Sequence, residues 1–366
     1  MKRFGLFVGA IVVTLIAFVA GYLVSRVSTP DLPYQTPTYA LNGVVTVPSF
    51  KLPPSSYMSD EAVNLLKLRS LASAAAPDPT QSIEESRAGI DKALAPFVAK
   101  MKQQYPVEIE ETSIAGIPAR IFSPVGLPTD PDRVLINLHG GGFSVCWDSC
   151  SILESAPISV LGGYKVISVN YRMGPEATHP AAVDDVLAVY SELMKSYKAQ
   201  NIGIYGCSAG GALTGQAAAM ITSNGLPSPG GVGIFGAGAL RFATGDSSYI
   251  AAYIDGSFPP PAKEGEQRAD MYRGYFDGAD VSGPIISPAL HLDVLAKFPP
   301  TLVTTGTRAA DLSPAVFTNS QLIKAGVDSR LIVAEGMGHC YQYIADFPEA
   351  RDAYDATVAF FKKNLK

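Results

Sequence analysis

Short apolar runs that alternate with helical stretches constrain the fold of this 366-residue chain more than any other feature. The runs lie at residues 134–138, 166–169, 202–205, 232–235, 302–305 and 331–334. They are apolar on both faces, which is typical of parallel strands that helices cover on both sides. Helical periodicity falls between them, at residues 181–195, 209–221, 315–325 and 349–365. This alternation predicts an α/β fold built on a parallel sheet.

The chain before residue 134 follows other patterns. Residues 107–110 and 117–122 alternate between apolar and polar side chains, which predicts two antiparallel strands. Residues 60–101 have helical spacing interrupted by Pro77 and Pro79, which predicts two helices. We therefore expect a helical cap segment at residues 57–105 and the main domain at residues 106–366.

A stretch from about residue 241 to 300 is longer than a single crossover between strands requires. It is rich in Tyr and Gly and contains three consecutive prolines, at 259–261. We expect an insertion that covers the carboxyl edge of the sheet and, with the helices of residues 57–105, shapes a pocket there.

A long apolar run lies close to the N-terminus. Residues 4–24 form an uncharged apolar run of 21 residues that follows Lys2 and Arg3. As a helix this run is about 31 Å long, close to one hydrocarbon core, whereas the apolar part of a signal peptide has roughly 7–15 residues. Residues 1–26 are therefore predicted to be a membrane anchor, with a cleaved signal peptide as the alternative.

The position of the basic residues before the apolar run favours an orientation with the N-terminus inside. We expect the rest of the chain to be exported to the periplasmic or extracellular side, either anchored to the membrane or secreted after cleavage. Residues 27–56 contain six prolines with Ser and Thr between them, which predicts a tether.

Composition excludes some functions and leaves others open. The net charge is −5 and no basic stripe is present, so we expect no nucleic-acid partner. The spacing of the cysteines is not that of a metal site, and no metal is expected. An exported domain can form disulfides, but buried free thiols are an equal alternative for these residues, which are Cys146, Cys150, Cys207 and Cys340. The sequence specifies no oligomeric state.

Two glycine-containing motifs are typical of an enzyme active site. Residues 206–210 read Gly-Cys-Ser-Ala-Gly, a pattern that turns sharply from strand to helix and exposes the hydroxyl of Ser208. Residues 139–143 read His-Gly-Gly-Gly-Phe, a loop in which backbone N–H groups are open to a developing negative charge. Each motif alone is weak, but both follow strand-like runs in this order. Together they predict ester hydrolysis, with oxyanion donors from the N–H groups of Gly141, Gly142 and Ala209.

A serine hydroxyl needs a histidine to take its proton and a carboxylate to hold that histidine. Among four histidines, His339 lies on the loop just past the last apolar run, which we expect at the same edge of the sheet as Ser208. Asp311 is the only carboxylate between residues 303 and 321, so it is the predicted acid. Its alternative role is to begin a helix as an N-cap. Glu335 and Asp346 are weaker candidates by position.

These residues resemble the hormone-sensitive-lipase-like branch of the α/β-hydrolases, a family of carboxylesterases and lipases. The resemblance rests on both glycine motifs, on Tyr-Arg-Met-Gly-Pro-Glu at 171–176 with the following Pro and Asp residues, and on Gly-Thr-Arg at 306–308 with His339. It covers residue 100 to the C-terminus. It implies a mostly parallel eight-stranded sheet, a helical cap, hydrolysis of short- to medium-chain acyl esters of small molecules, and no metal or organic cofactor.

The chain departs from this family at two positions. Cys207 stands where the family usually has an acidic residue before the nucleophile, and Ala309 stands where the catalytic acid commonly follows Gly-Thr-Arg. Asp311 lies two residues later, which leaves open a catalytically weak or inactive ligand-binding protein on the same scaffold. Transfer of the acyl group to an alcohol or amine instead of water is a further alternative.

Overall fold

The computed structural model describes residues 36–69, 81–241, 244–255 and 270–366. The chain divides into two compact units, Met1–Pro53 and Pro54–Lys366. In the first unit, β1 (Thr38–Tyr39) pairs antiparallel with β2 (Val45–Thr46). The apolar run at 4–24 lies outside the described residues. No helix among the described residues is long and apolar enough to span a membrane.

The second unit is built on one eight-stranded sheet with the order β10-β9-β8-β7-β5-β6-β4-β3. Its antiparallel pairs are β3 with β4 and β4 with β6, and the other neighbours are parallel. The predicted mostly parallel eight-stranded sheet is therefore confirmed. The strands are β3 (Val107–Ile114), β4 (Ile117–Pro124), β5 (Val134–Leu138), β6 (Lys165–Val169), β7 (Ile202–Cys207), β8 (Gly231–Phe235), β9 (Thr301–Gly306) and β10 (Ser329–Ala334).

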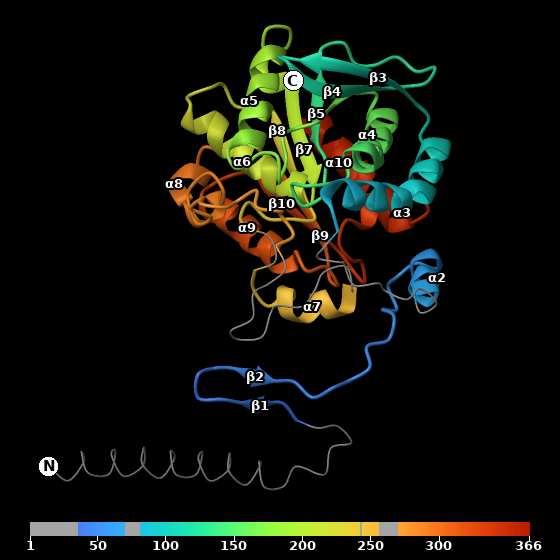
Figure 1. Cartoon of the computed structure of the whole chain (residues 1–366), viewed down its shortest axis with the longest axis vertical. Coiled ribbons are helices and arrows are strands. Elements are labelled where there is room, and N and C mark those ends of the chain that lie inside the picture. The colour runs from blue at the N-terminus through green and yellow to red at the C-terminus, as the bar shows by residue number, and fades with distance from the viewer. Residues whose placement is uncertain (1–35, 70–80, 242–243, 256–269) are drawn as a thin grey trace, which may run out of the picture. The chain divides into compact units, whose positions relative to one another are not determined.

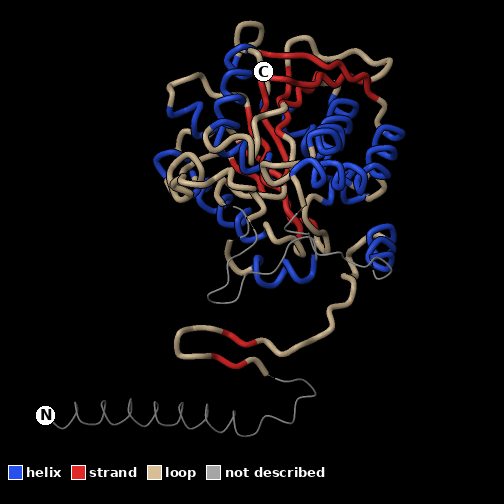
Figure 2. Tube along the Cα trace, viewed as in Figure 1, coloured by secondary structure: helices blue, strands red, loops and turns tan. Residues whose placement is uncertain are grey.

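Helices cover both faces of this sheet (Figures 1 and 2). One face packs against α5 (Ala181–Leu193), α6 (Ala209–Ser223) and α9 (Leu312–Lys324), and the other against α4 (Trp147–Gly162) and α10 (Pro348–Asn364). Alternate residues of a strand enter opposite cores: Ile136 lies with the first set of helices, and Leu135 with the second. This explains why the strands read as continuous apolar runs.

The helices predicted before the sheet are α2 (Asp60–Arg69) and α3 (Ile83–Gln104), and α3 packs against α4. Ser82 begins α3 with a capping box, because its side chain accepts from the Glu85 N–H and the Glu85 side chain accepts from the Ser82 N–H. The short helices of the second unit are η1 (Ala199–Asn201), α7 (Ser247–Asp255), η2 (Pro288–Leu290), α8 (Leu292–Leu295) and η3 (Tyr341–Tyr343).

The helix α4 has no clear helical pattern in the sequence. This helix is almost entirely buried and contains Pro157, so it shows neither a polar face nor an uninterrupted helical composition. It packs against α3, α10 and the strands β4, β5 and β6.

Candidate active site

The predicted nucleophile lies on the turn between β7 and α6. Ser208 has φ 59° and ψ −121°, a strained conformation for a non-glycine residue that is typical of functional sites. The flanking glycines allow the turn to pack against β5. A Cβ atom would lie 2.1 Å from the Leu138 carbonyl oxygen if placed on Gly206, and 1.7 Å from it if placed on Gly210. Only glycine therefore fits at these two positions.

The predicted oxyanion loop follows β5. Gly141 has φ +114°, and a Cβ atom there would lie 2.0 Å from the Val145 carbonyl oxygen. The carbonyl of Gly141 accepts the N–H groups of Ser144 and Val145, each at 3.0 Å, which closes the turn. Gly142, with φ +60°, lines the same pocket as Ser208 and Ala209. The loop therefore brings glycine backbone to the nucleophile.

His139 braces this loop. The side chain is fully buried, its Nδ1 donates to the Gly140 carbonyl at 2.7 Å, and its ring stacks on Tyr171 with centroids 4.4 Å apart. The hydroxyl of Tyr171 donates to the His139 carbonyl at 2.6 Å. Burial lowers the pKa of His139 to about 4, so the ring is neutral at physiological pH.

The predicted histidine and acid are in direct contact. The Nδ1 atom of His339, on the loop after β10, lies 2.6 Å from Oδ1 of Asp311. The hydroxyl of Thr305, on β9, donates to Oδ2 of Asp311 at 2.6 Å. Asp311 is fully buried at the N-cap position of α9, but its side chain makes no capping hydrogen bond. The geometry is that of a carboxylate that orients an imidazole.

One of the weaker acidic candidates forms an ion pair at the surface. Asp346 is half-exposed and pairs with Lys100 at 3.1 Å. The structure therefore brings His339 together with Asp311, whose role as the catalytic acid stays a prediction.

The pocket that contains Ser208 is mostly apolar. The predicted insertion at 241–300 contributes to its wall through Met271, Tyr272 and Phe276. Gln216, on α6, also lines the wall and is only 1% exposed. Its amide oxygen has no hydrogen-bond partner among the described residues.

All four cysteines form disulfides, Cys146–Cys150 and Cys207–Cys340. The second one joins the residue before Ser208 to the residue after His339. Among the described residues, no group of three or more His, Cys, Asp or Glu side chains could hold a metal ion.

Sequence reasoning missed Glu154, a buried carboxylate of α4 that bonds to the oxyanion loop and the nucleophile turn. The signal that could have found it is a lone acid within the apolar stretch at 150–162.

Comparison with known proteins places the chain among hydrolases. Residues 135–343 match a family model described as the alpha/beta hydrolase fold. The crystal structure of esterase E25 is 30% identical, has a TM-score of 0.75, and covers 88% of this chain and 99% of its own. An esterase from the bacterial hormone-sensitive lipase family is 25% identical, has a TM-score of 0.69, and covers 84% of this chain and 98% of its own.

Relatives of known activity are also named as ester hydrolases. An acetyl-hydrolase of Streptomyces hygroscopicus is 28% identical over 238 residues, which cover 63% of this chain and 75% of that protein. The versiconal hemiacetal acetate esterase stcI of Emericella nidulans is 32% identical over 124 residues, which cover 33% of this chain and only 41% of that protein.

Proposed function

From the premise that this chain belongs to the alpha/beta hydrolase fold family and is a carboxylic ester hydrolase, we propose that it hydrolyses short- to medium-chain acyl esters with Ser208 as its nucleophile. The observation that carries the proposal is the 2.6 Å contact between His339 and Asp311 at the sheet edge that also bears Ser208. The acetyl-hydrolase and acetate esterase relatives support a short acyl group.

In the proposed mechanism, Oγ of Ser208 attacks the ester carbonyl carbon while Nε2 of His339 takes the hydroxyl proton. Asp311 holds the Nδ1 proton of His339 and stabilises the imidazolium. The N–H groups of Gly141, Gly142 and Ala209 stabilise the oxyanion. The alcohol leaves with the proton from His339, and an acyl-Ser208 ester remains. Water then attacks this ester with His339 as base, which releases the acid and restores Ser208.

The test is hydrolysis of p-nitrophenyl acetate and butyrate by the full-length chain. Ser208→Ala and His339→Ala should each remove nearly all turnover while the folded state survives. Ser320→Ala, on the outer part of α9, and His291→Ala, whose ring bonds to the Ser282 carbonyl, are matched controls that should keep wild-type turnover. Retained turnover in either of the first two variants would overturn the assignment.

The binding-protein alternative arose from Ala309, which stands where the family commonly has its acid. The contact of Asp311 with His339 supplies a carboxylate to the imidazole from a position two residues later, which favours catalysis. Transfer to an acceptor other than water is separated from hydrolysis by adding an alcohol and measuring how the acyl-enzyme partitions between acid and new ester.

We further propose that residues 4–24 anchor the chain in a membrane and that the hydrolase domain is exported. The uncharged run of 21 residues supports the anchor, and the two disulfides are typical of an oxidising compartment. The full-mass chain should sediment with membranes after expression. A shortened soluble chain would favour the cleaved signal peptide, and a full-mass soluble cytoplasmic chain would overturn both.

A further inference from the structure

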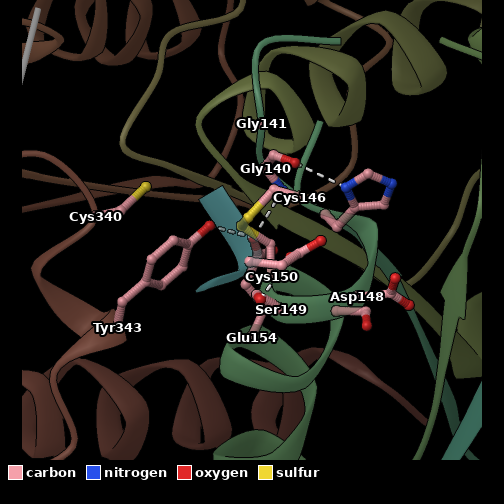
Figure 3. The surroundings of a disulfide bond; sticks show 12 residues. Gly140, Gly141, Cys146, Asp148, Ser149, Cys150, Glu154, Cys340 and Tyr343 are labelled. Carbon is pink, nitrogen blue, oxygen red and sulfur yellow. Dashed lines mark hydrogen bonds between the residues drawn. A yellow bond between two sulfur atoms is a disulfide. The ribbon is translucent and has the colours of Figure 1, made fainter. Parts of the chain in front are cut away.

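One buried carboxylate lies behind the proposed active site and accepts four hydrogen bonds. Oε1 of Glu154 accepts from the Gly140 N–H at 2.8 Å and from the Tyr343 hydroxyl at 2.5 Å. Oε2 accepts from the Asn137 side-chain amide at 2.8 Å and from the Cys207 N–H at 3.1 Å. The carboxylate thus accepts from three separate parts of the chain, which are β5 with its following loop, the end of β7, and η3. Figure 3 shows Glu154 with Gly140 and Tyr343.

Two of these donors are one residue away from groups that react in the proposed mechanism. Gly140 precedes the oxyanion donor Gly141, and Cys207 precedes the nucleophile Ser208. A displacement of the carboxylate would therefore move the oxyanion loop and the nucleophile turn relative to each other. A third donor, from Tyr343 in η3, lies four residues beyond His339.

The space around these contacts leaves little freedom for the two loops to slide. A Cβ atom on Gly140 would lie 2.6 Å from Oη of Tyr343, 3.1 Å from the Cys207 carbonyl oxygen and 3.4 Å from Oε1 of Glu154. The backbone of the oxyanion loop thus fits directly against the carboxylate, the tyrosine hydroxyl and the strand before the nucleophile.

A buried charge at Glu154 indicates a role beyond packing. Burial raises the pKa of the Glu154 carboxyl to about 7, which shows that ionisation at this place is unfavourable. All four neighbours donate to the carboxylate, and charge-assisted hydrogen bonds of this kind favour the ionised form. A glutamine has the same shape but offers one acceptor oxygen and turns an NH₂ group toward two donors.

We propose that Glu154 is a positioning residue that holds the oxyanion loop and the nucleophile turn in register through its hydrogen bonds to Gly140 and Cys207. The inference rests on the proposed serine mechanism and names a residue that acts on it without touching the substrate. Misplacement of reacting groups by about 1 Å can cost on the order of 10²-fold in rate. Loss of this register should therefore lower kcat more than it changes KM.

The experiment compares Glu154→Gln with Asp185→Asn in the full-length chain at pH 8. Asp185 is also a buried carboxylate, but its partner is Arg172, whose side chain is mostly exposed. Initial rates with p-nitrophenyl butyrate should show that Glu154→Gln lowers kcat by roughly 10- to 100-fold with KM within about threefold. Asp185→Asn should keep the wild-type kcat, whatever it does to thermal unfolding.

A second variant keeps the test decisive if Glu154→Gln folds poorly. Tyr343→Phe removes one donor and leaves the carboxylate, so kcat should fall by a smaller factor, about 2- to 10-fold, at unchanged KM. Unchanged kcat in a folded Glu154→Gln chain, or in Tyr343→Phe where only that variant folds, would overturn the inference.

The same assay separates this outcome from failure of the proposed function. If the wild type is inactive, or if Ser208→Ala keeps activity, the serine mechanism itself is wrong. If the wild type is active and Ser208→Ala is not, an unchanged Glu154→Gln enzyme rejects only the positioning role.

Discussion

At the scale of single residues, the start of α9 shows how one side chain can hold a helix-start position and still be directed into a site. Asp311 occupies the N-cap position, yet its carboxylate accepts from Thr305 and contacts His339 instead of the helix N–H groups. Ala309, two residues earlier, is fully buried. A side chain two positions later therefore reaches the imidazole from the same loop.

We predict that Asp311→Asn lowers kcat by about 10³- to 10⁴-fold, because an amide cannot stabilise the imidazolium as a carboxylate does. Steady-state hydrolysis of p-nitrophenyl acetate measures the loss. Asp346→Asn is the matched control and should leave kcat unchanged, since Asp346 pairs with Lys100 at the surface. Wild-type kcat in Asp311→Asn would reject this residue as the acid.

Gln216 is the polar exception in the pocket wall. Ser208, Ala212 and Gln216 are four residues apart, so they lie along one face of α6, and all three line the pocket. A long apolar acyl chain that passes the small Ala212 side chain would meet the amide of Gln216, whose oxygen has no hydrogen-bond partner among the described residues. An acetyl group on Ser208 is too short to reach Gln216, because these two residues are about 12 Å apart along the helix axis.

Replacement Gln216→Leu should therefore favour longer acyl chains. Removal of an unsatisfied amide is worth about 1–3 kcal/mol, so kcat/KM for p-nitrophenyl hexanoate relative to acetate should rise by roughly fivefold or more. The ratio of the two specificity constants, measured in wild type and variant, is the readout. An unchanged or lower ratio would show that the acyl chain does not run along this face.

At the scale of elements, the loops at the carboxyl ends of parallel strands assemble the site. The loops after β5, β7, β9 and β10 carry the oxyanion glycines, Ser208, Asp311 and His339, and these strands end at one edge of the sheet because they are parallel. The Cys207–Cys340 disulfide then joins the end of β7 to the loop after β10.

The two disulfides should contribute unequally to stability. Cys207 and Cys340 are separated by 133 residues, whereas Cys146 and Cys150 are separated by 4. Loop-closure entropy gives about 5 kcal/mol for the long loop and about 2 kcal/mol for the short one. Urea unfolding of the Cys207→Ser/Cys340→Ser chain should show the larger loss relative to the Cys146→Ser/Cys150→Ser chain. Equal losses would contradict an entropic contribution that depends on loop length.

At the scale of the whole molecule, Glu154 couples folding to pH. Its pKa is raised from 4.5 to about 7 by burial, so between these values the folded chain binds more protons at this site than the unfolded chain. Stability from this group is therefore complete below pH 4.5 and is lost as the pH rises through 7. The tyrosines that face it, Tyr171, Tyr205 and Tyr343, have raised pKa values and stay neutral throughout.

The unfolding free energy of the wild type relative to Glu154→Gln should decrease by up to about 3 kcal/mol between pH 4.5 and pH 8. Denaturant unfolding of both chains at several pH values gives this difference, and titration of all other groups cancels in it. A difference that is constant, or that increases with pH, would show that Glu154 is not held at a raised pKa.

The α/β class, the order of the strands along the chain and the local motifs could all be predicted from the sequence. Each of these depends on neighbours in the sequence. The apolar runs form strands because both faces are covered, and the glycines at 206, 210 and 141 are required where a Cβ atom would collide with backbone. The residues Ser208 and His339 were likewise chosen from their positions just after strands.

The contacts between distant segments could not be predicted in this way, because they form only when the domain packs. The tertiary structure pairs Cys207 with Cys340, directs Asp311 to His339 instead of to its own helix, and places Glu154 of an unpredicted helix against two loops. Such contacts depend on how strands and helices pack, and residues such as 207 and 340 approach each other only when the sheet has formed. Local patterns in the sequence specify the helices and strands, but the packing of the whole domain decides which hydrogen-bond partner each buried polar group finds.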